Sequence, residues 1–90
     1  MNNVPTDRRA VVRVQLRLGT PYAGSPGAKK LGGYTVMVLG EAKASEWPEY
    51  SEGDVEGVVW TTPRQVTQVV SNLRACEGVI DAKGEGDDGP

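Results

Sequence analysis

The sequence predicts an α+β fold, a two-layer sandwich in which one helix, at about residues 62–76, covers one face of a four-stranded, mostly antiparallel sheet. Three observations support this prediction. Valine occurs 13 times in 90 residues and phenylalanine is absent, and β-branched side chains favour strands. Four segments have the composition or periodicity of strands. One segment has the end signals and apolar spacing of a helix. The predicted order along the chain is β-β-β-α-β.

The first predicted strand begins near residue 10. Apolar and polar residues alternate there in the order Val12, Arg13, Val14, Gln15, Leu16, Arg17 and Leu18. This alternation indicates a strand with one buried face. The polar row is either a β-ribbon that meets nucleic acid or a solvated, charge-protected strand surface. The net charge of −2 and the few aromatic residues argue against nucleic acid.

The next two predicted strands follow a glycine-rich segment. Residues 20–33 contain four glycines and two prolines, which predicts a loop that is either disordered or ordered by a partner. Residues 34–41 are almost all apolar, so this strand is expected in the centre of the sheet or covered on both faces. Residues 55–62 form the third predicted strand. There, Gly57 indicates a bulge or a close backbone approach, and Trp60 is expected in the core.

The predicted helix has signals at both ends. Thr62, Pro63 and Gln65 have the spacing of a capping box with proline at the first helical position. Gly78 is expected to end the helix, and residues 79–83 form the last strand. The apolar stripe of the helix consists of Val66, Val69, Val70, Leu73 and Cys76.

These segments predict a flexible N-terminus at residues 1–9, a single domain at residues 10–84 and a disordered acidic tail at residues 85–90. The strands that flank the helix are expected to be parallel, either as neighbours or with one strand between them, and joined by a right-handed crossover. Since one helix covers only one face of the sheet, the other face is expected to lack helical cover.

Composition excludes several kinds of chemistry. The chain has no histidine, and its single cysteine, Cys76, rules out an internal disulfide and zinc sites built from cysteine clusters. Cys76 continues the apolar stripe of the helix, so we interpret it as a packing residue. The acidic loop with Glu46, Glu49 and Glu52 is expected to be solvated, because nothing in its sequence suggests burial. We therefore expect no enzyme activity, no catalytic residues, no metal site and no cofactor.

The N-terminal residues lack the apolar region of a signal peptide, and no apolar run is long enough to span a membrane. We expect a cytoplasmic protein that does not bind membranes.

Charge is segregated along the chain: residues 1–40 hold six basic residues and one acidic residue, and residues 41–56 hold six acidic residues and one basic residue.

The function predicted from these features is a small protein-interaction module. Small, acidic chains without enzymatic motifs are common among phage and mobile-element proteins that act on host factors, which favours a regulator or inhibitor of this origin that acts on a host macromolecule. Homodimerisation through the uncovered sheet face is also expected. The residues expected to bind the partner are Trp47, Tyr50, Glu49, Glu52, Arg13 and Arg17. The alternative is a small-molecule-binding regulatory domain, since the β-α-β end resembles ferredoxin-like sensor domains.

Overall fold

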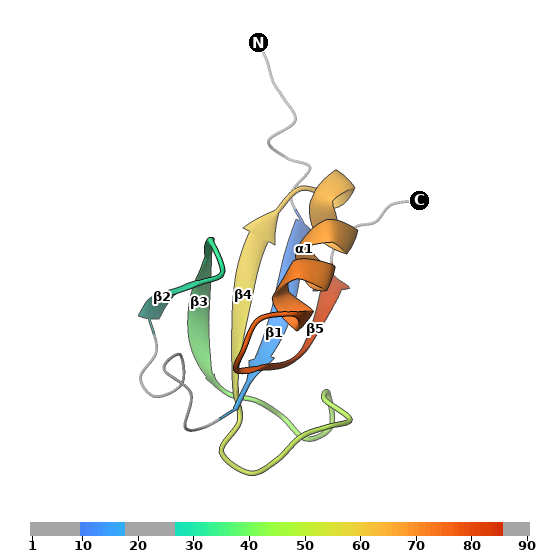
Figure 1. The fold of residues 1–90 in the computed structure, drawn as a ribbon. Helices are drawn as coiled ribbons and strands as arrows, with labels where there is room; N and C mark the ends of the chain where they lie inside the picture. Colours follow the sequence, from blue (N-terminus) through green and yellow to red (C-terminus); the bar gives the residue numbers. More distant parts are fainter. Residues whose placement is uncertain (1–9, 18–26, 86–90) are drawn as a thin grey trace.

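A computed structural model describes residues 10–17 and 27–85. The described strands are β1 (Ala10–Leu16), β2 (Gly27–Leu31), β3 (Tyr34–Glu41), β4 (Val55–Thr61) and β5 (Val79–Glu85). Between β4 and β5 lie a 3₁₀ turn, η2 (Pro63–Gln65), and the helix α1 (Val66–Arg74). The strands form a single sheet in the order β2-β3-β4-β1-β5, and every neighbouring pair is antiparallel (Figure 1).

The predicted α+β class is confirmed, but the predicted number of strands is wrong. The described residues form five strands rather than four, because Gly27–Leu31 is a strand within the segment predicted as a loop. This strand and β3 form a hairpin whose two-residue turn, Gly32 and Gly33, has φ angles of +57° and +88°. Two positive φ angles in succession are what a tight hairpin turn needs, and glycine adopts them without steric cost. The rest of the predicted loop, at residues 20–26, lies outside the described residues.

The strands that flank the helix are parallel with one strand between them, which is one of the two predicted arrangements. Strand β1 pairs with both β4 and β5 and is antiparallel to each. The last strand continues to Glu85, two residues beyond its predicted end. The predicted strand at residues 34–41 is interior to the sheet, between β2 and β4. However, only one of its faces is covered, because its buried and exposed residues alternate.

The helix packs on β1 and β5 with the apolar stripe that its spacing predicts. Val69 and Leu73 are buried, and Val66, Val70 and Cys76 pack against the core. The capping box is not formed: no described side chain caps the helix at Thr62. The chain instead enters through the 3₁₀ turn, and the Thr61 hydroxyl lies 3.4 Å from Oε1 of Gln65. The α-helix is therefore shorter than the predicted 62–76.

The main core lies between the sheet and the helix. Its buried members are Val12, Val14, Leu16, Leu31, Val36, Val38, Val55, Val59, Val69, Leu73 and Ala82. The prediction of a close backbone approach at Gly57 is confirmed, because a Cβ there would lie 2.9 Å from the Met37 carbonyl oxygen. The prediction that Trp60 is a core residue is wrong. In β4, Val55 and Val59 face the helix, so Trp60 lies on the opposite face and is 62% exposed.

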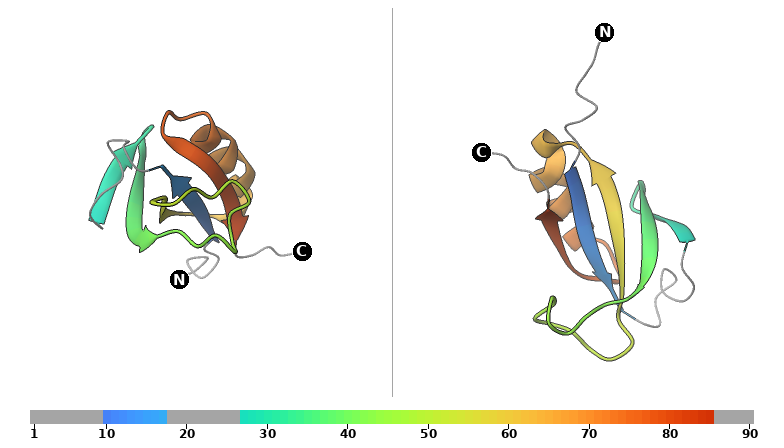
Figure 2. Two further views of the ribbon diagram at one scale, coloured as in Figure 1. Left: turned by 90° about the horizontal axis from the view of Figure 1, so that it is seen from below. Right: turned by 180° about the vertical axis from the view of Figure 1, so that it is seen from behind.

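The sheet curves so that the turn of the β2–β3 hairpin approaches the C-terminal end of α1 (Figure 2). Strands β2 and β3 are far from β5 in the strand order. Nevertheless, Asn72 of α1 donates a hydrogen bond of 2.7 Å to the Tyr34 hydroxyl of β3. A Cβ on Gly32 of the hairpin turn would lie 2.6 Å from Sγ of Cys76. This curvature encloses Leu31 and Val36, which are buried although α1 lies over β1 and β5. No helix of the described residues is long and apolar enough to cross a membrane.

Candidate interaction surface

The sheet face opposite α1, here called the second face, has a covered half and an exposed half. Neighbouring residues on adjacent strands share a face in an antiparallel sheet. Met37, Val58, Arg13 and Lys83 are such neighbours across β3, β4, β1 and β5. The loop of residues 42–54 covers the β1 and β5 side of this row. The prediction that this face lacks helical cover therefore holds for the described residues, but a loop takes the place of a helix over half of it.

The loop is a compact unit with its own buried side chain. The Ala42 N–H donates a 2.9 Å hydrogen bond to the Asp54 carbonyl oxygen, which closes the base of the loop. Trp47 is 1% exposed, and the Lys83 ammonium lies 4.4 Å from the centroid of its ring. Lys83 Nζ also donates to the Glu46 carbonyl oxygen at 2.7 Å. Trp47 thus forms a small core between the loop and the second face, with cations against its ring.

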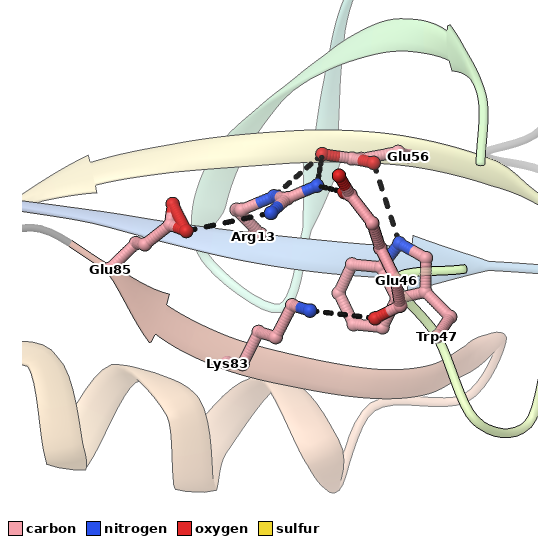
Figure 3. A network of polar contacts seen from close by, with 6 residues as sticks. All are labelled: Arg13, Glu46, Trp47, Glu56, Lys83 and Glu85. Carbon is pink, nitrogen blue, oxygen red and sulfur yellow. Dashed lines mark hydrogen bonds and ion pairs between the residues drawn. The ribbon is translucent and has the colours of Figure 1, made fainter. Parts of the chain in front are cut away.

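Arg13 is the centre of the polar contacts beneath the loop (Figure 3). Its guanidinium donates to Glu56 of β4 at 2.7 Å, to Glu46 of the loop, and to Glu85 of β5 at 3.5 Å. The Trp47 indole N–H lies 3.4 Å from the other Glu56 oxygen. The hydrogen bond with Glu46, followed by those with Glu56, raises the pKa of Arg13, so this side chain stays charged. The same hydrogen bond lowers the pKa of Glu46 below its ordinary value.

Asp54 is the second centre of polar contacts, at the base of the loop. Its carboxylate accepts hydrogen bonds from Arg17 at 2.9 and 3.0 Å, from the Gln15 amide at 2.6 Å and from the Ser51 N–H at 2.9 Å. Burial by itself would raise the pKa of Asp54, but the bonds from Arg17, Ser51 and Gln15 outweigh it and the pKa is lowered. Gln15 is fully buried, and its Oε1 has no hydrogen-bond partner among the described residues.

These contacts correct the interpretation of Glu46 as a solvated residue and of the β1 polar row as a solvated surface, whereas Glu49 and Glu52 are exposed as expected. The two segments neutralise each other: Arg13 pairs with Glu46, and Arg17 pairs with Asp54. The pairing was missed because the residues are more than 30 positions apart. The segregation of charge along the chain was the available signal, since a basic strand and an acidic loop attract each other.

The six residues predicted to bind a partner lie in different environments in the structure. Arg13 and Arg17 make ion pairs within the chain. Trp47 is buried, so its ring is not part of the surface. Tyr50 is half-buried, and Glu49 and Glu52 are exposed on the loop. The prediction that these residues bind a partner stays a prediction.

The exposed half of the second face consists of Met37 and Leu39 on β3 with Val58 and Trp60 on β4. Among the described residues, Met37, Leu39 and Trp60 are the large apolar side chains that are exposed, at 42%, 56% and 62%. Met37 and Val58 are direct neighbours across the two strands. The register of β3 and β4 shifts between Val38 and Gly40, so Leu39 lies at a bulge. The period of two in a strand was the signal that could have found this group, because Met37 and Leu39 must face away from the side of β3 on which Val36 and Val38 are buried.

No other protein helps to identify this surface: comparison with family models, with curated proteins and with solved structures gave no match to the chain. Within the described residues, no group of three or more histidine, cysteine, aspartate or glutamate side chains is placed to hold a metal ion.

Proposed function

We propose that this chain is a small, non-enzymatic binding module, and that a protein partner binds the exposed half of its second face. One observation carries this proposal: Met37, Leu39 and Trp60 are exposed together on the same face of the sheet, beside a half that the chain covers with its own loop. Gathered, exposed apolar side chains are typical of protein interfaces. Tryptophan in particular is enriched among the residues that contribute most to binding.

The polar groups of the second face favour binding over catalysis. Arg13, Glu46 and Asp54 already have partners within the chain. A carboxylate acts as an efficient general base near neutral pH when its pKa is raised toward that pH. The pKa of Glu46 and that of Asp54 are instead lowered. These groups serve to hold the loop on the sheet.

The composition supports a regulator or inhibitor of phage or mobile-element origin that acts on a host macromolecule in the cytoplasm. This part of the proposal depends on the small size of the chain, on its pI of about 5.0 and on its lack of histidine. Nucleic acid is the less favoured partner, because Arg13 and Arg17 of the basic strand are engaged with carboxylates.

The test is affinity capture from an extract of the native cell with tagged wild-type protein, followed by measurement of the dissociation constant for the captured partner. Met37→Asp places a charge in the middle of the exposed half, and we expect it to weaken binding by about tenfold or more. The matched control is Thr67→Asp, which adds the same charge at an exposed position of α1. We expect it to bind like the wild type.

Thermal shift separates this function from small-molecule sensing. A rise of several degrees in Tm with amino acids or nucleotides at millimolar concentration, unchanged in Met37→Asp, would favour a ligand-binding regulatory domain. Partner capture that is equal in wild type and Met37→Asp would contradict binding through the exposed half.

A further inference from the structure

We propose that the side chains of Arg74 and Asp81, here called the edge cap, keep the outer edge of β5 closed. Without the edge cap, a second copy of this chain pairs its own β5 antiparallel to this strand. The inference concerns the edge of the sheet, so it is independent of the exposed half of the second face. It assigns a role to an ion pair that the proposed function does not use.

Strand β5 has a free edge, because it is the last strand in the sheet order and its strand partner among the described residues is β1 (Figure 1). The backbone groups of successive residues in a strand point alternately to opposite sides. The N–H of Arg17, directly after β1, donates to the Gly78 carbonyl oxygen, so the odd-numbered residues of β1 direct their backbone groups toward β5. They pair there with residues 81, 83 and 85. Ala82 and Gly84 therefore direct their N–H and C=O groups outward.

The edge cap occupies both outward groups of Ala82. The Ala82 N–H donates a 2.8 Å hydrogen bond to Oδ1 of Asp81, and its carbonyl oxygen accepts one of 3.1 Å from Nε of Arg74. The same nitrogen of Arg74 lies 3.2 Å from Oδ1 of Asp81, so the two side chains form one unit at the edge. A hydrogen-bonded pair of residues in an antiparallel ladder exchanges two N–H···O bonds. The edge cap thus takes the place of one residue of an added strand.

The two edges of the sheet are protected in different ways. Strand β2 has five residues, of which two are lysines, and short, lysine-bearing edge strands resist pairing with another sheet. Strand β5 has seven residues. Its residue Ile80 is an extra residue in the register with β1, because Asp81 pairs with Gln15 and Val79 pairs with Leu16. This bulge ends the regular edge, and the edge cap lies within the regular stretch that remains, residues 81–85.

Charge identifies a second copy of β5 as the strand that fits this edge. Antiparallel pairing about a two-fold axis at Ala82 places Asp81 of each copy opposite Lys83 of the other. Opposite charges at such positions stabilise a pair of strands, and like charges destabilise it. A register centred on Lys83 places this lysine opposite its own copy and Asp81 opposite Glu85. The edge is therefore self-complementary in the register centred on Ala82, which is the residue that the edge cap blocks.

The edge cap acts by occupying the edge rather than by adding stability. The side chain of Arg74 is 56% exposed, and exposed ion pairs contribute little to the free energy of unfolding. Alanine is also favourable in a helix, so Arg74→Ala does not weaken α1 through helix propensity. We therefore expect Arg74→Ala to keep a Tm close to that of the wild type, although it uncovers the Ala82 carbonyl group.

Sedimentation velocity of the whole chain at concentrations up to about 1 mM compares the wild type with Arg74→Ala. We expect Arg74→Ala to self-associate about tenfold more tightly than the wild type, because the two hydrogen bonds at Ala82 become available to a second copy. The associated species should have twice the mass of 9.6 kDa. The matched control is Arg64→Ala, which removes the same charge from an exposed position of η2. It is expected to sediment like the wild type.

Two measurements locate the contact at β5. In Arg74→Ala, the exchange of the Ala82 amide hydrogen, followed by NMR, is expected to slow as the protein concentration rises, because this N–H bonds to the second copy. Addition of Asp81→Lys to Arg74→Ala places a positive charge opposite Lys83 and is expected to abolish the gain in association. Circular dichroism confirms that each variant is folded.

Three outcomes overturn the inference. The first is a folded Arg74→Ala variant that sediments like the wild type at about 1 mM. The second is an increased association in which the exchange of the Ala82 amide does not depend on concentration, because the copies then meet elsewhere. The third is an association that Asp81→Lys leaves unchanged. The proposed function is tested separately, since it depends on the loss of the captured partner in Met37→Asp.

Discussion

Asp54 is the residue that connects the end of loop 42–54 to β1. It is 1% exposed, and its carboxylate joins Arg17 and Gln15 of β1 to the end of the loop. A buried carboxylate is tolerated only when its hydrogen-bonding capacity is satisfied by charged or polar donors. Asp54 meets this condition and, in doing so, holds the loop against the sheet.

This network predicts a pH dependence of stability. The pKa of Asp54 is lowered in the folded protein, so the ionised carboxylate stabilises the fold above the ordinary aspartate value of 3.8. This stabilisation is lost as the pH falls through the lower folded value. We expect Asp54→Asn to reduce the free energy of unfolding by about 2 kcal/mol at pH 7. The difference from wild type should shrink as the pH falls below about 4.

Urea denaturation at a series of pH values measures both effects. The control is Glu52→Gln, which neutralises an exposed carboxylate of the same loop. We expect it to leave the free energy of unfolding at pH 7 unchanged. A difference between wild type and Asp54→Asn that grows as the pH falls would contradict the proposed role of Asp54.

At the scale of elements, loop 42–54 is a covering layer and not only a connection. Unlike an ordinary surface loop, it has a buried tryptophan. Trp47 packs between the loop and two cations, Arg13 of β1 and Lys83 of β5. Loops of this length that are closed at their base and packed by their own side chains are frequently functional.

We expect Trp47→Ala to lower the free energy of unfolding by about 3–5 kcal/mol, the usual cost of removing a buried aromatic side chain. Trp60→Ala removes the same group from an exposed site and is expected to cost less than about 1 kcal/mol. Urea denaturation followed by circular dichroism compares the two variants. Equal losses would mean that the loop does not pack on the sheet as described.

The β2–β3 hairpin is the second element with a testable contact, because its turn meets the end of the helix. Gly32 has a φ of +57°, and a Cβ at this position would lie 2.6 Å from Sγ of Cys76. Gly33 also has a positive φ, but no described atom lies within 4 Å of a Cβ built there. Alanine at Gly33 would therefore cause backbone strain alone, whereas alanine at Gly32 would cause backbone strain and a steric clash.

We expect Gly33→Ala to destabilise by about 1 kcal/mol, which is the backbone cost alone. Gly32→Ala should add the clash and cost about 2–4 kcal/mol. In a Cys76→Ala background, Gly32→Ala should cost less by about 1 kcal/mol, because the opposing sulfur is absent. Thermal or urea denaturation of the wild type, Gly32→Ala, Cys76→Ala and the double variant completes the double-mutant cycle. Strictly additive effects of Gly32→Ala and Cys76→Ala would contradict the contact.

At the scale of the whole molecule, the fold covers one face of the sheet with α1 and half of the other with a loop. The basic strand and the acidic loop are separated in sequence but adjacent in space, so Arg13 and Arg17 are neutralised by carboxylates of the same chain. The apolar surface that remains exposed lies on β3 and β4. We propose that a protein partner binds that surface.

Local features of this fold could be predicted because they depend on neighbours in the sequence. The alternation in β1, the helical spacing from Val66 to Cys76 and the close approach at Gly57 are all confirmed. The hairpin turn at Gly32 and Gly33 was also present as a local signal, since two glycines between short strand-like segments are typical of a tight turn. The high glycine and proline content of residues 20–33 outweighed it in the prediction.

The sequence by itself determined the α+β class, the position of the helix and the absence of histidine chemistry and internal disulfides, because these follow from composition and short-range periodicity. Only the tertiary structure decided the roles of the two tryptophans and of the acidic loop. Trp47 is buried and Trp60 is exposed because a distant loop folds back onto β1, through ion pairs between residues more than 30 positions apart. Contacts of that kind leave no periodic pattern in the chain, and they determine which half of the second face remains available for binding.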